Sequence, residues 1–415
     1  MSIPSPMFSR RRDLDVAREA IVASLIFFHT ARIFDNLGFH IKNEPTEPAV
    51  TLVVIFASLW GIPLLFTIAG FAIRHSLQKR TVVEFVRERF QRLFIPFVVG
   101  LLVIVPPQMY YQQLFRNPIY QGSFAEFYIH FFNISRGFPW FFSASPATHL
   151  FETGHLWFLK VLLVETVLLL PICLYLRQPA GQRLVGRFTA FASRRSGVFL
   201  LALPVAIIEA ALGTDMSGGW NHATYVVFLI YGYLFAADAR FGQVLCKHWK
   251  SHRVIAVLGS IVGIAGFVIF SGVAHTNPLE AYDPISVMLR FFKGLVGWWW
   301  IIAIWGFLEA MRARRQAQRI LRESSRELQV SLHHRTFWDK VERYANQAVL
   351  PFYLLHQTII IIIGFYIVQW QISALLKFLI ISFSALAITL LLYEIVIRRT
   401  RVMRFLFGVK PMGRY

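Results

Sequence analysis

Two ionisable residues lie in the first apolar stretch of the chain, where charge is costly. Arg18 and His29 are separated by eleven positions in a mainly apolar segment. Eleven residues make about three turns of α-helix and a rise of roughly 16 Å, so both side chains would lie on one face. Arg18 would then lie near the inner membrane surface, with His29 deep in the hydrocarbon region. A neutral imidazole in a low-dielectric site is a suitable general base.

Two further ionisable residues, Glu165 and His356, fall within later apolar stretches. Such residues usually face the interior of a helix bundle or a water-filled cavity, and they often mark a functional site. The alternative is structural: a neutral histidine bonded between helices, or a carboxyl group that stabilises packing. Taken singly, none of these residues decides between the two interpretations.

The basic segment after the second apolar stretch contains Arg89 and Arg92, three positions apart. On a helix this spacing places two guanidinium groups on one face, and the planar fork of arginine suits phosphate oxygens. For the arginines alone, ordinary anchoring of a cytoplasmic loop is the favoured interpretation.

A third group, Gly154-His155-Leu156-Trp157, opens the fourth apolar stretch on the outer side. His155 and Trp157 would contact a sugar or order water there, or form part of an interfacial aromatic belt.

The composition requires that a membrane positions these residues. Hydrophobic residues make up 56% of the 415 residues and charged residues only 15%, whereas soluble domains carry roughly 25% charged residues. The net charge of +20 lies mostly between the apolar runs, which indicates topology signals and anionic-lipid contacts and argues against nucleic acid. Cys173 and Cys246 lack metal-ligand spacing, and we expect neither a disulfide nor a zinc site.

The apolar runs predict an all-α, single-domain bundle of about ten transmembrane helices over residues 1–415. The predicted segments are 16–35, 50–73, 93–110, 156–176, 197–213, 222–238, 254–273, 287–309, 347–368 and 373–396. Arg290 and Lys293 are expected inside the eighth of them.

Basic and non-basic connections alternate along the chain, which supports an even number of helices. The basic segments begin at Arg10, Arg74, Arg177, Arg240, Arg312 and Arg398. The positive-inside rule therefore places both termini in the cytoplasm, with basic tails at 1–15 and 397–415. The polar range 312–346 is expected to be a cytoplasmic loop containing a helix on the inner leaflet.

Together these features resemble the membrane-bound acyltransferase-3 family over nearly the whole chain. The matching motifs, in order, are Asp15-x-x-Arg18 leading to His29, Phe66-x-x-Ala69-Gly70-Phe71, Arg89-x-x-Arg92 before a proline-interrupted helix, His155-Leu156-Trp157-Phe158-Leu159, and Leu350-Pro351-Phe352-Tyr353-Leu354-Leu355-His356-Gln357. Many members have serine where this chain has Ala69, which weakens any role assigned to that position. The most similar-looking branch is the glucans biosynthesis protein C type, through 154–159 and 392–411, which is associated with succinylation of periplasmic glucans.

The resemblance implies transfer of a succinyl or acetyl group from a cytoplasmic donor, acyl-CoA, to a hydroxyl of an extracytoplasmic glycan. His29 would deprotonate the acceptor or carry the acyl group, and Arg18 would hold the donor or polarise its carbonyl. Arg89 and Arg92 would bind the phosphates of CoA. No tightly bound cofactor is implied.

The remaining candidates would complete the substrate path. The resemblance implies that His155 and Trp157 bind the sugar, and that Glu165 and His356 complete the polar path. The expected location is the inner membrane of a bacterium, in contact with anionic lipids and without nucleic acid. Formation of a homo-oligomer is left open.

Two other classes of protein have the same general features. A transporter or flippase would also combine ten helices with buried ionisable residues, although the chain shows no internal repeat. A membrane sensor would use the basic range 312–343 as a docking surface. A transporter leaves its substrate unchanged, whereas an acyltransferase changes the mass of its substrate.

Overall fold

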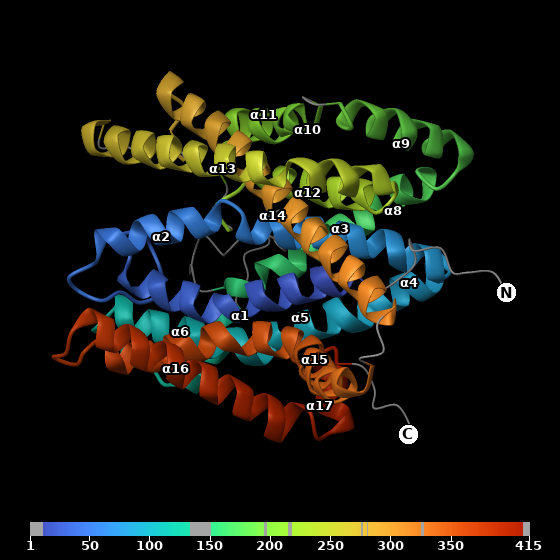
Figure 1. Ribbon diagram of the computed structural model, residues 1–415. Helices are drawn as coiled ribbons and strands as arrows, with labels where there is room; N and C mark the ends of the chain where they lie inside the picture. The colour runs from blue at the N-terminus through green and yellow to red at the C-terminus, as the bar shows by residue number, and fades with distance from the viewer. Residues whose placement is uncertain are drawn as a thin grey trace. The chain divides into compact units, whose positions relative to one another are not determined.

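The computed structural model describes residues 11–132, 151–194, 197–214, 218–274, 277–279, 281–324 and 328–409. This part of the chain is largely helical and contains no strand (Figure 1). The elements are α1 (Arg12–Phe34), α2 (Pro48–Ser58), α3 (Gly61–Lys79), α4 (Val82–Arg89), η2 (Phe90–Phe94), α5 (Ile95–Val99), η3 (Gly100–Ile104), α6 (Val105–Arg116), α7 (Phe124–Phe131), η4 (Gly154–Leu156), α8 (Trp157–Tyr175), α9 (Pro179–Ala192), α10 (Gly197–Leu200), α11 (Ala202–Leu212), α12 (His222–Phe235), α13 (Ala239–Ala274), α14 (Pro284–Ser324), α15 (Leu328–Ile367), α16 (Ala374–Leu392), η5 (Tyr393–Ile397) and α17 (Arg401–Leu406).

Seven helical spans among the described residues are long and apolar enough to cross a membrane, and a bent pair raises the number to eight. The seven are Pro48–Lys79, Val82–Arg116, Gly154–Tyr175, Ala239–Gly272, Pro284–Gln318, Asp339–Ile367 and Ala374–Ile397. The chain is therefore a polytopic helical membrane protein. The other three predicted segments correspond to α1, to α10 with α11, and to α12. Because α1 carries charged residues at both ends and α12 is short, the count of about ten stays a prediction, as does the cytoplasmic position of the termini.

The chain forms two compact units, each assembled from three separate stretches. The first contains Met1–Arg18, Ile55–Phe85 and Glu165–Glu342, and the second contains Glu19–Val54, Val86–Val164 and Arg343–Tyr415. Several boundaries fall inside helices, so α1, α8 and α15 each contribute to both units. The polar range 312–346 is covered by the end of α14 and the start of α15, apart from 325–327, which lie outside the described residues.

The first unit is built on helix pairs that pack closely. Helices α13 and α14 pack against each other, as do α11 and α14. Helices α3 and α12 cross where Gly70 meets the backbone of Leu229 and Gly232 meets that of Thr67. A Cβ atom on Gly70 would lie 1.9 Å from the carbonyl oxygen of Leu229, and one on Gly232 would lie 1.8 Å from that of Thr67. Small residues therefore set the distance between these two helices, which gives a packing role to the Ala69-Gly70 motif.

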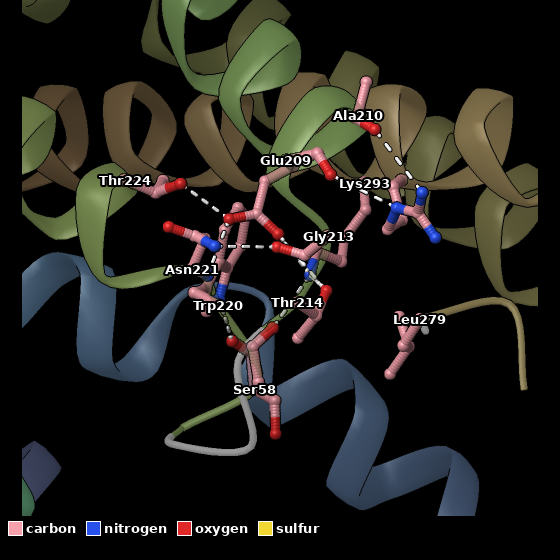
Figure 2. A network of polar contacts seen from close by, with 12 residues as sticks. Ser58, Glu209, Ala210, Gly213, Thr214, Trp220, Asn221, Thr224, Leu279 and Lys293 are labelled. Carbon is pink, nitrogen blue, oxygen red and sulfur yellow. Dashed lines mark hydrogen bonds and ion pairs between the residues drawn. The ribbon is translucent and has the colours of Figure 1, made fainter. Parts of the chain in front are cut away.

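A buried ion pair joins α11 and α14 in the first unit (Figure 2). Glu209 is fully buried, and its Oε2 lies 2.7 Å from Nζ of Lys293. Thr224 donates a hydrogen bond to Glu209 Oε1 at 2.6 Å. Lys293 also donates to Thr214 Oγ1 and to the carbonyl of Gly219, both at 2.8 Å. Lys293 thus lies inside the helix where the sequence placed it, and its charge is compensated.

Arg290, one turn before Lys293, is also fully buried. Its guanidinium donates to the backbone carbonyls of Glu209 at 3.2 Å and of Pro278 at 3.0 Å. The same group lies 4.8 Å from the ring centre of Tyr282. These contacts replace the water that an arginine would lose on burial, so a structural role accounts for Arg290.

Two π-helical turns interrupt the helix that follows Arg89 in the second unit. The turn η2 precedes Pro96 and the turn η3 precedes Pro106. Because proline lacks an N–H and its ring clashes with the carbonyl four residues earlier, the helix widens at these points. The amide of Ile95 accordingly bonds to the carbonyl of Phe90, five residues back. The predicted proline interruption is therefore present, as a widening rather than a break.

Aromatic and polar contacts join the remaining helices of the second unit. Phe27 and Phe34 on α1 meet Phe383 and Phe378 on α16, with ring centres 6.1 and 6.2 Å apart. Helix α15 contacts α6 and η3, where Thr358 Oγ1 donates to the carbonyl of Ile104 at 2.8 Å. These contacts place polar residues of α1, α6 and α15 inside one unit.

Candidate active site

His155 lies at the start of α8, where the chain enters the helix through the 3₁₀ turn η4. Its side chain is buried, with only 4% of its surface exposed. Its Nε2 lies 2.9 Å from the carbonyl oxygen of Leu354, and its Nδ1 lies 3.1 Å from Oε1 of Gln108. Gly154 has a φ of +50° and sits against the amide of Gln108. Both ring nitrogens of His155 are thus held by contacts inside the second unit.

His356 lies on α15 and is completely buried. Its Nδ1 lies 2.7 Å from the carbonyl oxygen of Tyr353. A carbonyl can only accept, so Nδ1 carries the proton and donates this bond. The other nitrogen, Nε2, therefore bears a lone pair, and it is buried without a hydrogen-bond partner among the described residues. The ring of His356 lies next to that of His155, with centres 5.3 Å apart.

His29 on α1 is half-buried and is a second neighbour of His356. The ring centres of His29 and His356 are 5.2 Å apart. Phe39 stacks against the imidazole of His29, with ring centres 6.1 Å apart and planes 14° apart. The Nδ1 atom of His29 is buried, and no described residue bonds to it. His356 on α15 therefore neighbours two other imidazoles, His29 from α1 and His155 from η4.

A fourth imidazole, His40, lies in the connection between α1 and α2 and shares Gln108 with His155. Its Nδ1 donates to the carbonyl oxygen of the Gln112 side chain. Its Nε2 accepts from the side-chain amides of Gln108 and Gln357, each at 3.1 Å. Burial lowers the pKa of His40 to about 4, and the bond to Gln112 opposes this shift only in part. His40 is therefore neutral at pH 7, with both nitrogens engaged, and we call His29, His40, His155 and His356 the histidine cluster.

The three arginines with predicted roles are Arg18, Arg89 and Arg92, and none of them belongs to the histidine cluster. Arg18 lies three turns before His29 on α1, and its guanidinium lies 3.4 Å from a carboxylate oxygen of Asp15. Arg89 ends α4, and Arg92 lies in the π-helical turn after it, where it pairs with Glu88 at 3.4 Å. A π-helical turn contains more residues than a turn of α-helix. The angle around the helix axis between Arg89 and Arg92 therefore differs from the angle that the same spacing gives in an α-helix.

The two remaining candidates lie on α8. Trp157 is half-buried, and its ring meets that of Phe158 edge to face at 6.3 Å. Glu165 belongs to the first unit and is buried, with 4% of its surface exposed. Neither of its carboxyl oxygens has a hydrogen-bond partner within the described ranges. The structure therefore brings His29, His155 and His356 together, whereas Arg18 and Glu165 belong to the first unit.

Comparison with known protein families assigns the chain to a class. Residues 11–394 match a family model described as an acyltransferase domain. The helical fold and this match define the class, a polytopic membrane acyltransferase. The match covers most of the chain, and the protein belongs to the acyltransferase-3 family. No curated protein and no solved structure matches the chain.

Sequence reasoning missed several polar residues that hold the cluster. Gln108 and Gln112 follow two consecutive prolines and are four positions apart, a spacing that places them on one helix face. Gln357 directly follows His356, so the motif that ends in His356-Gln357 contained a second polar residue to which no role was given. His40 lies in a connection, where no helical period indicates which way a side chain points.

Proposed function

We propose that this protein transfers an acyl group from an acyl-CoA thioester to a hydroxyl group of an extracytoplasmic glycan. One observation carries the proposal: in a chain of this family, three imidazoles from distant segments meet inside one unit. His29 is the half-buried member of the three, so it is the one assigned to contact substrate. His356 and His155 are buried.

The proposed reaction needs one proton acceptor and balances without a further reactant. His29 takes the proton of the acceptor hydroxyl while the hydroxyl oxygen attacks the thioester carbonyl carbon. The carbon–sulfur bond then breaks, and the protonated imidazole returns the proton to the sulfur of CoA. The products are an ester and free CoA. Arg18 is assigned to the donor, whose carbonyl oxygen becomes negative during the attack.

The substrate assignments extend this proposal. Arg89 and Arg92 bind the donor phosphates at the cytoplasmic side, where the positive-inside rule places their loop. Trp157 and His155 are assigned to the acceptor sugar. Because His155 is buried, its effect on the sugar is assigned to pass through the other histidines of the cluster. Glu165 is assigned to the polar path. The resemblance of 154–159 and 392–411 to the glucans biosynthesis protein C type is the ground for proposing succinyl as the acyl group and a periplasmic glucan of a bacterium as the acceptor.

Mass spectrometry of cell-envelope glycans tests the activity. A deletion strain would be complemented with wild type, with His29→Ala, or with His130→Ala, an exposed histidine on α7 that serves as the control. Wild type and the control should add an ester increment of about 42 Da for acetyl or about 100 Da for succinyl, and His29→Ala should add none. Transfer by His29→Ala at the wild-type rate would overturn the assignment. A transporter would leave the glycan mass unchanged in every strain.

The donor assignment has a separate test in purified protein. The double change Arg89→Ala with Arg92→Ala should raise the apparent KM for acyl-CoA by about tenfold or more and change kcat little, because binding rather than chemistry is lost. Arg87→Ala, an exposed arginine on the same helix, is the matched control. An unchanged KM would return both arginines to the role of loop anchors.

A further inference from the structure

Two nitrogen atoms in the histidine cluster are buried and lack hydrogen-bond partners among the described residues: Nδ1 of His29 and Nε2 of His356. A buried polar atom without a partner destabilises the folded state, and such atoms are few in native proteins. The other cluster histidines differ, because both nitrogens of His40 and of His155 face partners. The two atoms without partners belong to neighbouring rings.

The distance between these rings allows the two atoms to satisfy each other. The ring centres are 5.2 Å apart and the ring planes are tilted by 44°. A ring nitrogen lies roughly 1.1 Å from the centre of an imidazole, so two facing nitrogens would be about 3 Å apart, within hydrogen-bond range. His356 is held by its bond to Tyr353, so the movement that would join the two atoms is assigned to the His29 side chain.

The proton positions are complementary as well. The carbonyl of Tyr353 holds the proton of His356 on Nδ1, so Nε2 of His356 can only accept. Its partner must then donate, which places the proton of neutral His29 on Nδ1. The lone pair of His29 therefore falls on Nε2, the nitrogen directed away from His356. The buried ring thus selects the tautomer of the half-buried ring.

We propose that His356 is a positioning residue that orients His29 and selects its basic tautomer, an inference that rests on the function proposed above. Nδ1–H of His29 donates to Nε2 of His356, while Nε2 of His29 takes the proton of the acceptor hydroxyl. The positive charge that forms on His29 is stabilised by the same bond, and the proton then passes to the departing sulfur. His356 keeps its own proton throughout, so the step balances without it.

Two substitutions at position 356 separate the positioning role from packing. The side-chain amide nitrogen of asparagine occupies the place of Nδ1, so His356→Asn keeps the bond to Tyr353 and loses the acceptor. The side-chain amide of glutamine reaches the place of Nε2, so His356→Gln keeps an acceptor for His29. His252, a buried histidine of the first unit, is the control as His252→Asn. All variants are purified in detergent and compared in elution profile and in transfer from acyl-CoA to glycan.

The expected result is a fall in kcat of about a hundredfold for His356→Asn with KM nearly unchanged, as for loss of a group that supports general base catalysis. His356→Gln should recover at least about tenfold, and His252→Asn should match wild type.

Two outcomes would overturn the inference: equal rates for the two variants at position 356, or a wild-type rate for His356→Asn. The inference fails alone if His29→Ala is inactive while His356→Asn is fully active. The proposed function fails, and the inference with it, if wild-type protein forms no acylated glycan.

Discussion

Replacing Lys293 by methionine should destabilise the protein by about 3–5 kcal/mol, because it leaves the carboxylate of Glu209 buried without its counter-ion. The side chain of Glu209 is 0% exposed and that of Lys293 13% exposed, so neither charge is relieved by water. The lysine also supplies hydrogen bonds to Thr214 and Gly219. The bond from Thr224 to Glu209 stays in place and limits the loss.

The control is an ion pair of similar length at an exposed site. Arg398 lies 2.7 Å from Glu394, with 46% and 38% of the two side chains exposed. Exposed pairs of this kind contribute about 0–1 kcal/mol. Arg398→Met should therefore change the free energy of unfolding by less than about 1 kcal/mol.

The assay is equilibrium unfolding in mixed detergent micelles, followed by tryptophan fluorescence. Trp220 is a useful reporter, because Nζ of Lys293 lies 4.7 Å from the centre of its ring. The double change Lys293→Met with Glu209→Gln should recover most of the loss, since no charge is then left without a partner. A loss below about 1 kcal/mol for Lys293→Met, or a double variant as unstable as the single one, would refute the reasoning.

Three further predictions concern positions where small changes have specific effects. Gly70→Ala should lower the free energy of unfolding by about 1–3 kcal/mol or more through overpacking, because its Cβ would lie 1.9 Å from a backbone oxygen. The control is Gly186→Ala, whose Cβ would lie in open space and which should leave thermal unfolding unchanged. Gly154→Ala should lower kcat more than it lowers thermal stability, because a φ of +50° disfavours a side chain and its Cβ would lie 2.8 Å from the amide of Gln108; an unchanged turnover rate would contradict this. The pKa of His40 is lowered to about 4 in the folded protein, so below about pH 6.5 the unfolded chain binds a proton there more readily than the folded protein does. The free energy of unfolding therefore falls as the pH decreases from about 6.5 toward 4. Unfolding titrations at pH 7.5 and 5 should show a larger fall in this free energy for wild type than for His40→Gln. Equal slopes for the two proteins would contradict that prediction.

Hydropathy located the long apolar helices, because the requirement for about 20 apolar residues leaves few alternatives, but it did not predict the shorter helices α4, α7, α9 and α17. Each of the ten predicted segments is helical in the structure. Hydropathy did not predict the π-helical turns around Pro96, since the carbonyls that proline displaces find new partners only in the folded helix. Position 293 was correctly placed inside a helix, but its partner Glu209 lies on another segment and was not expected.

The candidate site was predictable residue by residue but not as an assembly. The cost of polar groups in an apolar run singled out His29 and His356, and both lie in the cluster. Sequence spacing could not indicate that they lie side by side, because they come from helices more than three hundred positions apart. His155 was expected at an outer surface, and its burial depends on Gln108 and Leu354, which belong to other helices.

The close crossing of α3 and α12 has a consequence for biosynthesis. A membrane protein is inserted from its N-terminus onward, so α3 leaves the ribosome before residues 80–221 and its partner α12 have been made. During that interval the glycine face of α3, which includes Gly70, has no helix to pack against. The first unit can therefore close only after α12 has been inserted, and nascent chains that end before residue 222 should depend on lipids or an insertion chaperone to shield that face.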